Sequence, residues 1–273
     1  MLREASSFKQ LAGGPMTAEN VGDHFSDYFD VHFAHTKELL WQVHRIRFDV
    51  YCREFGYERE EDCPGGQERD EYDDDSYHCL IAHRESGMGA GCIRVVVPPS
   101  ASPDFLLPME RFCGPSLTDP VLHPSHLPRE RIAEVSRLAV HTQFRRRAGE
   151  SQSPIGRLDI EHLSEEEKRT FPLLGLALFC AGTSLMRLAG REDAFVMMER
   201  RLARRLTATG FPFAQVGEPI EYHGSRAAYH VGVQQVLDTM PDAVRGLHQH
   251  VDQSLHREWR SRDGANAPDS PSH

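Results

Sequence analysis

Acidic residues crowd one loop of the sequence, where six carboxylates fall within the run GGQERDEYDDDSYH, residues 65–78. We single out Glu68, Asp70 and Asp73. Mutual repulsion in such a cluster raises the pKa of some of its members. Carboxylates so placed can hold a cationic amine and take up the proton that it loses when it attacks an acyl carbon. A solvated acidic loop is the alternative, and the ligand and glycine spacing of an EF-hand is absent, so we predict no metal site.

Three arginines lie in segments that otherwise look buried: Arg47 on an amphipathic helix, Arg94 within CIRVVV and Arg137 within EVSRLAV. A buried guanidinium is costly unless a carboxylate pairs with it, so we expect partners among the acidic loop and Glu134. In a regular strand Glu134 and Arg137 point to opposite faces, whereas a bulge would let them meet. These residues form either a catalytic constellation or a purely structural ion-pair network.

Two further basic clusters and one polar cluster are candidates for binding. Arg145, Arg146 and Arg147 follow a predicted strand. On a helix Arg200, Arg201, Arg204 and Arg205 would crowd one side, although a solvated helix face is the alternative. Tyr222 and Arg226 lie in EYHGSRAAY and could recognise a carboxylate through a bidentate arginine contact, unless this stretch is only a glycine-capped turn.

The elements that would position these residues alternate between helix and strand. Apolar spacing predicts an amphipathic helix over residues 38–54 and a largely buried helix over 171–189. A further helix follows in the arginine-rich stretch and ends at Gly210. Predicted strands cover residues 78–84, 91–98, 132–140, 194–198 and 213–217. This order indicates an α/β fold, a mixed sheet flanked by helices in a three-layer α/β/α sandwich.

Composition limits the class of protein. The chain has 273 residues, 39% of them hydrophobic, and a net charge of -10, which argues against nucleic-acid binding. It contains neither an apolar run long enough to span a membrane nor a secretory h-region, so we predict a cytoplasmic protein. Its six cysteines form no C-x-x-C pair, which suits reduced thiols. We expect a mobile N-terminal segment at residues 1–26, one domain over 27–260 and a disordered tail at 261–273.

The order and spacing of the charged and aromatic residues resemble the signature of the acyl-homoserine-lactone synthases. The residues that carry this resemblance are Arg47, Tyr51, Tyr57, Glu68, Asp70, Asp73, Arg94, Phe112, Glu134 and Arg137. Tyr51 and Tyr57 stand where those synthases usually have Phe and Trp. Four phrases look like a nearer group, the acyltransferases of the GNAT superfamily associated with PEP-CTERM/exosortase systems. These phrases are RFDVYCREFGYE, ERDEYDDDSYHCLIAHR, IAEVSRLAVHTQFRRR and EYHGSRAAYHVG.

The resemblance implies an N-acyltransferase on a GNAT-like fold. Two parallel strands, residues 132–140 and 194–198, would separate to hold the pantetheine arm of the donor. Glu68 is the first candidate for binding the acceptor or assisting as base, with Asp70, Asp73, Arg47, Arg94, Glu134 and Arg137 in the same catalytic group. Tyr57 and Phe112 would contact the substrate, as would Tyr222 and Arg226.

The same superfamily contains long-chain N-acyl amino acid synthases, so the resemblance favours an amino acid as acceptor. The usual phosphate loop is interrupted by an insertion at residues 151–171. An acyl carrier protein is therefore favoured over coenzyme A as donor, with docking on the two arginine clusters. No permanently bound cofactor is expected. Two alternatives stay open: an autoinducer synthase that uses S-adenosylmethionine, and a non-catalytic module that binds an acyl carrier.

Overall fold

The structure is a computed structural model that describes residues 18–145 and 172–265. One sheet forms its centre, with strands in the order β1-β2-β3-β4-β5-β8-β6 and β7 paired to β8. The strands are β1 (Phe29–Phe33), β2 (Ser76–His83), β3 (Gly89–Val96), β4 (Ile132–Val140), β5 (Asp193–Met198), β6 (Ala214–Gln215), β7 (Ile220–Glu221) and β8 (Ser225–Gly232). All pairings are antiparallel except that of β4 with β5. The sheet is therefore mixed, as the sequence predicts.

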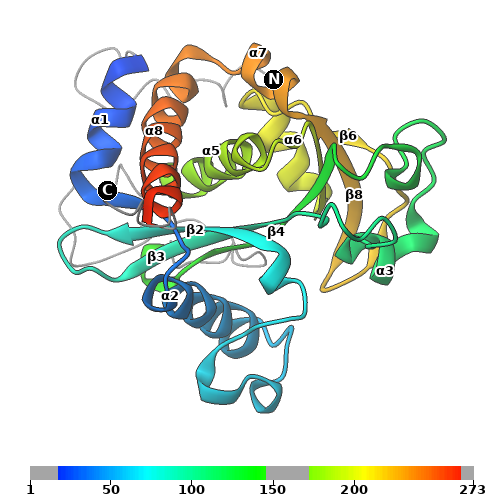
Figure 1. The fold of residues 1–273 in the computed structure, drawn as a ribbon, viewed down its shortest axis with the longest axis horizontal. Helices are drawn as coiled ribbons and strands as arrows, with labels where there is room; N and C mark the ends of the chain where they lie inside the picture. The colour runs from blue at the N-terminus through cyan, green and yellow to red at the C-terminus, as the bar shows by residue number, and fades with distance from the viewer. Residues whose placement is uncertain (1–17, 146–171, 266–273) are drawn as a thin grey trace, which may run out of the picture.

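Helices cover both faces of this sheet. Figure 1 shows α1, α5 and α8 on one side and α2 on the other, which gives the expected three layers. The helices are α1 (Ala18–Tyr28), α2 (Lys37–Arg47), α3 (Pro108–Cys113), α5 (Pro172–Leu188), α6 (Arg200–Ala208), α7 (Val233–Thr239) and α8 (Asp242–Ala265). Strands β2 and β3 are buried on both faces because α5 and α2 enclose them. This explains why their sequences are nearly continuous apolar runs.

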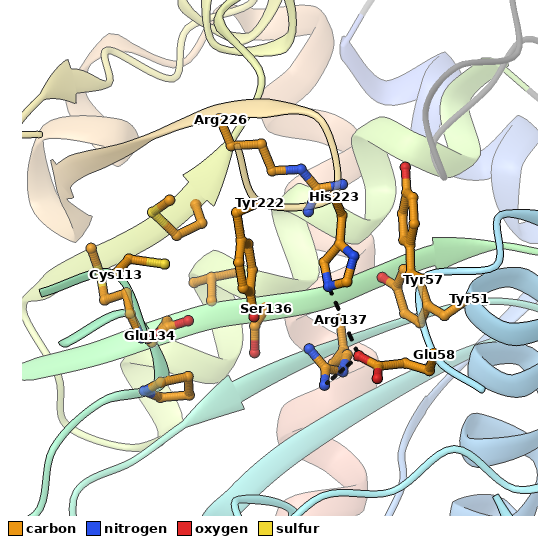
Figure 2. A pocket seen from close by; sticks show the side chains of 14 residues that line it. Tyr51, Tyr57, Glu58, Cys113, Glu134, Ser136, Arg137, Tyr222, His223 and Arg226 are labelled. Carbon is orange, nitrogen blue, oxygen red and sulfur yellow. Dashed lines mark hydrogen bonds and ion pairs between the residues drawn. The ribbon is translucent and has the colours of Figure 1, made fainter. Parts of the chain in front are cut away.

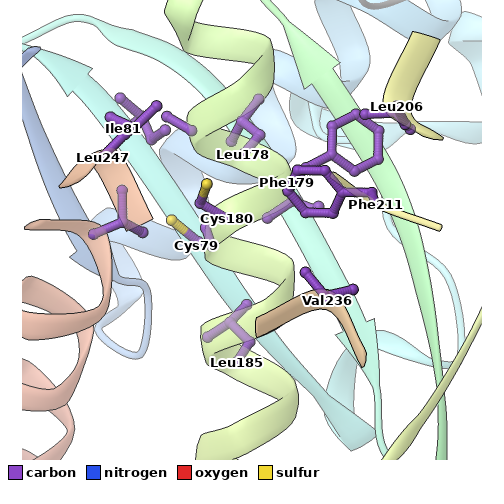
Figure 3. Packing of buried hydrophobic residues seen from close by; sticks show 14 of the residues in the cluster. Cys79, Ile81, Leu178, Phe179, Cys180, Leu185, Leu206, Phe211, Val236 and Leu247 are labelled. Atoms are coloured by element: carbon purple, nitrogen blue, oxygen red, sulfur yellow. The ribbon is translucent and has the colours of Figure 1, made fainter. Parts of the chain in front are cut away.

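The main core lies between the sheet and the helices α5 and α8. Figure 3 shows Leu178 and Cys180 of α5 packed near Cys79 and Ile81 of β2, all with no exposed surface. Leu247 of α8 closes the same cluster. The predicted buried helix is thus a core helix, α5, and no helix in the described parts of the chain is long and apolar enough to cross a membrane.

The domain begins earlier than the predicted boundary at residue 27. Helix α1 starts at Ala18, and its Val21 and Phe25 are buried in the main core, where α1 packs on α8. Residues 21–26 therefore contribute to the fold and are not a mobile extension. Helix α8 likewise continues past residue 260 to Ala265.

Three local irregularities shape the site. The predicted helix over 38–54 divides into α2 and a π-helical segment, η2 (Phe48–Glu54), a geometry that is frequent at functional sites. Strand β4 carries a bulge against β3 near Arg137, whose φ is 50°. Strands β4 and β5 pair only from Ile132 to Glu134 and then separate.

The predicted strand at 213–217 is reduced to the two exposed residues of β6.

Candidate active site

Three arginines and three carboxylates form an ion-pair network in which Asp70 and Arg137 are partly exposed and the other four side chains are buried. Arg47 donates to Glu68 and makes two bonds to Asp73, of 2.5 and 3.1 Å. Arg94 donates to Asp70 and Asp73 at 2.5 and 2.9 Å. Arg137 completes the ring through Glu68 at 3.1 Å and Asp70 at 2.9 Å. Within this network each carboxylate therefore meets two guanidinium groups and each guanidinium meets two carboxylates, and Arg137 also lies 4.0 Å from Glu58.

This arrangement keeps the acidic residues ionised. Burial alone would raise the pKa of Glu68, Asp70 and Asp73, but the neighbouring arginines outweigh it and hold all three pKa values below their ordinary range. The mutual repulsion expected from the sequence does not dominate. Glu68 is only 2% exposed, and its two oxygens accept hydrogen bonds from Arg47 and Arg137, which makes it a poor proton acceptor. It also does not line the nearby cavity.

Glu134 is separate from the network, which corrects the expectation that it pairs with an arginine. Its Oε2 accepts a hydrogen bond from the backbone N–H of Met109 at 2.8 Å, and its side chain has no ion pair among the described residues. Burial raises the pKa of Glu134 to about 7, against the opposing effects of that N–H and of Arg94 and Arg137. A carboxyl group with this pKa can accept a proton near neutral pH.

Glu134 lies in a polar cavity where β4 leaves β5. Figure 2 shows Glu134, Ser136 and Arg137 of β4 along one side of it, with Tyr222, His223 and Arg226 from the β7–β8 hairpin opposite. The remaining wall consists of Tyr51, Tyr57, Glu58, Pro108, Met109, Cys113, Val135 and Met197. The bulge at Arg137 places both Glu134 and Arg137 on this cavity, although they do not bond to each other.

Backbone strain also marks this cavity. In the described residues, Arg137 and His223 are the two non-glycine positions with positive φ, at 50° and 52°. Both line the cavity. Such conformations cost free energy and tend to occur at functional sites. A strained backbone residue from each of two separate segments, β4 and the β7–β8 turn, therefore lines the same cavity.

Aromatic rings cover the cavity between the loop after η2 and the β7–β8 turn. Tyr57 lies 4.7 Å from the ring of His223, and the guanidinium of Arg226 lies over Tyr57 at 5.4 Å. The buried Nε of Arg226 has no hydrogen-bond partner, and no carboxylate of the described residues pairs with it. Of the predicted substrate-contact residues, Tyr57, Tyr222 and Arg226 thus meet at one cavity.

Phe112 does not lie there, contrary to the prediction. Its side chain is 55% exposed and lies beneath the guanidinium of Arg111. Met109 and Cys113 line the cavity instead, because residues four apart share a helix face and Phe112 points away from it. That spacing was visible in the sequence. Ser136 could likewise have been found, because it follows Glu134 by two residues in a strand.

The two arginine clusters differ in exposure. Arg145 is 4% exposed, paired with Glu54 and placed over the ring of Phe55, so it is not available to a partner surface as predicted. Arg146 and Arg147 lie outside the described residues. Arg200, Arg201, Arg204 and Arg205 are all exposed on α6. Among the described arginines of the two clusters, those of α6 form an exposed basic surface, and their role in docking stays a prediction.

A buried trio, His44, Asp73 and His78, has the residue types of a metal site. However, Arg47, Arg94 and the backbone N–H of Asp70 already occupy both oxygens of Asp73. Burial lowers the pKa of His44 to about 4 and that of His78 to about 3, so both rings are neutral. The adjacent guanidinium charges make this trio unsuited to a cation.

Comparisons with known proteins agree with this geometry. Residues 46–153 match the family model described as an acetyltransferase (GNAT) domain. That region holds the whole charge network, Glu134 and the start of the strand separation. The chain is an acyltransferase with a GNAT-type domain.

One curated protein and two solved structures also resemble this chain. The acyl-homoserine-lactone synthase of Agrobacterium fabrum is 28% identical over 185 residues, covering 67% of this chain and 73% of that protein. TofI, solved in a ternary complex with an inhibitor and MTA, superposes with a TM-score of 0.53 at 17% identity, over 79% of this chain and 98% of its own. The synthase LasI gives 0.50 at 16% identity, over 78% and 96%. These structures share the fold with this chain.

Proposed function

We propose that this enzyme transfers a fatty acyl group from a carrier thioester to the amino group of a small acceptor, with Glu134 as the proton acceptor. The observation that carries the proposal is the position of Glu134. It is a buried carboxyl group with its pKa near 7, and it faces a cavity where two parallel strands separate. This role replaces the expectation that Glu68 is the first candidate for base assistance.

The reaction follows from this placement. The acceptor's ammonium group gives one proton to Glu134, and the free amine attacks the thioester carbonyl carbon to form a tetrahedral oxyanion. The C–S bond then breaks, and a second proton from nitrogen converts the departing thiolate into the carrier thiol. Beyond Glu134 the backbone of β4 has no ladder partner on β5, which leaves main-chain groups to bind the donor.

An amino acid is the acceptor that the cavity supports best. Within the described part of the chain Arg226 has no carboxylate partner, and its buried Nε makes no hydrogen bond, so a carboxylate is its natural partner. An α-amino acid that placed its carboxylate there would hold its amine within the same cavity that Glu134 lines. Arg226→Ala should therefore raise the KM for the acceptor by about tenfold or more, with little change in the KM for the donor.

The second candidate is an acyl-homoserine-lactone synthase that takes S-adenosylmethionine as acceptor. The curated relative from Agrobacterium fabrum carries that activity in its name. The rings of Tyr57, Tyr222 and His223 beside Glu58 could also hold an adenosine or a sulfonium group. The two acceptors differ in product, so product identity separates them.

For the donor we favour an acyl carrier protein, whose acidic docking helix would complement the exposed arginines of α6. Coenzyme A is the alternative donor. Cytoplasmic location and an association with PEP-CTERM/exosortase systems stay predictions from the sequence.

Mass spectrometry of lipid extracts from cells that express the protein tests the function, with the Glu134→Gln variant as comparison. A new N-acyl amino acid that disappears in the variant is the expected result and identifies both acceptor and chain length. An acyl-homoserine lactone would favour the second candidate. A product unchanged by Glu134→Gln would contradict the role of Glu134.

A further inference from the structure

Helix α3 forms one wall of the cavity and contacts the proposed proton acceptor. Its Met109 N–H donates the hydrogen bond to Glu134 Oε2, at 2.8 Å. The side chains of Met109 and Cys113 from the same helix line the cavity. The position of this six-residue helix therefore decides whether Glu134 keeps its donor.

A second carboxylate holds α3 in place from outside the cavity. Glu110 Oε2 accepts from the backbone N–H of Leu107 at 2.9 Å, which fixes the start of the helix. Arg129 donates to both oxygens of Glu110, at 2.7 and 2.8 Å, in a two-bond fork. The Glu110 side chain is 7% exposed and that of Arg129 is 20% exposed, so water competes weakly for these bonds.

The Arg129 backbone is itself anchored. Its carbonyl accepts from Arg191 at 3.4 Å, and Arg191 also donates to the carbonyl of Pro98 at 2.9 Å. Neither Glu110 nor Arg129 lines the cavity. The pair can therefore act on Glu134 through the position of α3 and through the charge of Glu110, but not by contact with the substrate.

We propose that Glu110 and Arg129 are positioning residues, which hold the Met109 N–H against Glu134 and thereby set how readily Glu134 takes up the acceptor's proton. This inference rests on the proposed function, because it assigns a purpose to the hydrogen bond of Glu134. It adds a determinant of the acid–base chemistry that lies outside the cavity.

The direction of the effect follows from charge. A backbone N–H favours the ionised carboxylate, so losing it raises the pKa of Glu134. Removing Arg129 would also leave the negative charge of Glu110 without its partner, which acts in the same direction. The other charged or titratable groups that influence Glu134, or that it influences, are Arg94, Arg137, Tyr72, Cys113 and Tyr222. None of them bonds to Arg129. Cys113 lies on α3 and moves with that helix, whereas the other four belong to other elements.

The test is a carbon-13 NMR titration of the full chain labelled at the glutamate carboxyl carbons. The resonance missing from Glu134→Gln identifies Glu134 without any substrate. Its titration midpoint should rise by about one pH unit in Arg129→Ala, the size expected for one hydrogen bond to a charged acceptor. The midpoint should stay unchanged in Arg131→Ala, a matched control that breaks a nearby ion pair with Glu192 and Asp193.

Arg129→Lys separates positioning from charge and guards against a variant that fails to fold. Lysine keeps the charge but cannot make the two-bond fork, so it should still raise the midpoint, by less than alanine. A wild-type midpoint in Arg129→Lys, or in folded Arg129→Ala, would overturn the proposal. Because the titration needs no acyl transfer, it stands apart from the proposed function, which fails if Glu134→Gln keeps full activity.

Discussion

The two glutamates Glu68 and Glu134 show how environment divides roles at the residue scale. Glu68 is bonded to two guanidinium groups, and its pKa is lowered. Glu134 has one backbone donor, and burial brings its pKa to about 7. Both carboxylates are buried, but only Glu134 faces the cavity. The first is suited to holding structure, the second to moving a proton.

Substituting each glutamate should separate these roles. Glu134→Gln removes the proton acceptor without breaking an ion pair, so kcat should fall by about a hundredfold or more while the melting temperature changes little. Glu68→Gln leaves Arg47 and Arg137 short of charge, so it should lower the free energy of unfolding by roughly 3 kcal/mol. Steady-state kinetics measures kcat of both variants, and denaturant unfolding measures their free energies of unfolding. If the two variants lost the same activity and had the same stability, the separate roles of Glu134 and Glu68 would be contradicted.

Arg94 tests whether the network supports the fold. Its side chain is 1% exposed and bonds to Asp70 and Asp73, so Arg94→Ala leaves the buried Asp73 and the partly buried Asp70 each with one guanidinium partner fewer. We expect a loss of roughly 3 kcal/mol in the free energy of unfolding. Denaturant titration measures it, with Arg111→Ala as control because Arg111 pairs with the exposed Glu71. A change no larger than that of the control would show that the pairing is not stabilising.

At the scale of elements, sequence reasoning succeeded where local spacing sets the structure. Strand β4 runs over the predicted residues 132–140, and the buried helix lies within one residue of its predicted bounds. Three arginines in apolar segments required carboxylate partners, and the acidic loop provides them. Burial cost alone was enough for that inference.

Sequence reasoning failed where contacts between distant segments determine the geometry. The isolation of Glu134 depends on the bulge in β4 and on a backbone N–H from α3, which no spacing near Glu134 reveals. Arg145 looked like part of a basic surface, but tertiary packing buries it against Glu54 and Phe55. Helix α1 is short and polar in sequence, and only its contact with α8 makes it part of the domain.

We predict that an acyl carrier protein docks on the exposed arginines of helix α6. Changing Arg200, Arg201, Arg204 and Arg205 to glutamate should raise the KM for an acyl carrier donor by about tenfold or more and spare acyl-CoA. The four side chains are exposed, so the fold should survive. Parallel kinetics with both donors measure the difference. Equal losses with the two donors, or no loss, would rule out docking on α6.

At the scale of the whole molecule, side chains of α8 bond to and pack against the first strand, β1. Glu258 of α8 accepts from the Phe33 backbone N–H at 2.7 Å and lies 2.8 Å from His32 Nδ1. Trp259 packs on Phe33 and Tyr77 next to it. This contact joins the two ends of the described chain across one edge of the sheet.

The His32 contact makes stability depend on pH. The bond to Glu258 raises the pKa of His32 above its ordinary 6.5, despite the opposing effect of burial. Its contribution is therefore complete below pH 6.5 and disappears as pH rises through the folded-state value. The free energy of unfolding of the wild type should exceed that of His32→Gln by up to about 1 kcal/mol at pH 6 and by nothing at pH 9. Thermal unfolding at both pH values checks this, and a pH-independent gap would refute it.

The central claim is amide formation with Glu134 as proton acceptor, and a pH–rate profile of the purified enzyme tests it most directly. The assay supplies an acyl carrier thioester and amino acids, and follows thiol release together with the mass of the amide. We predict that kcat/KM rises with pH through an apparent pKa of about 7 and that this limb disappears in Glu134→Gln. A variant that keeps both the rate and the limb would contradict the account.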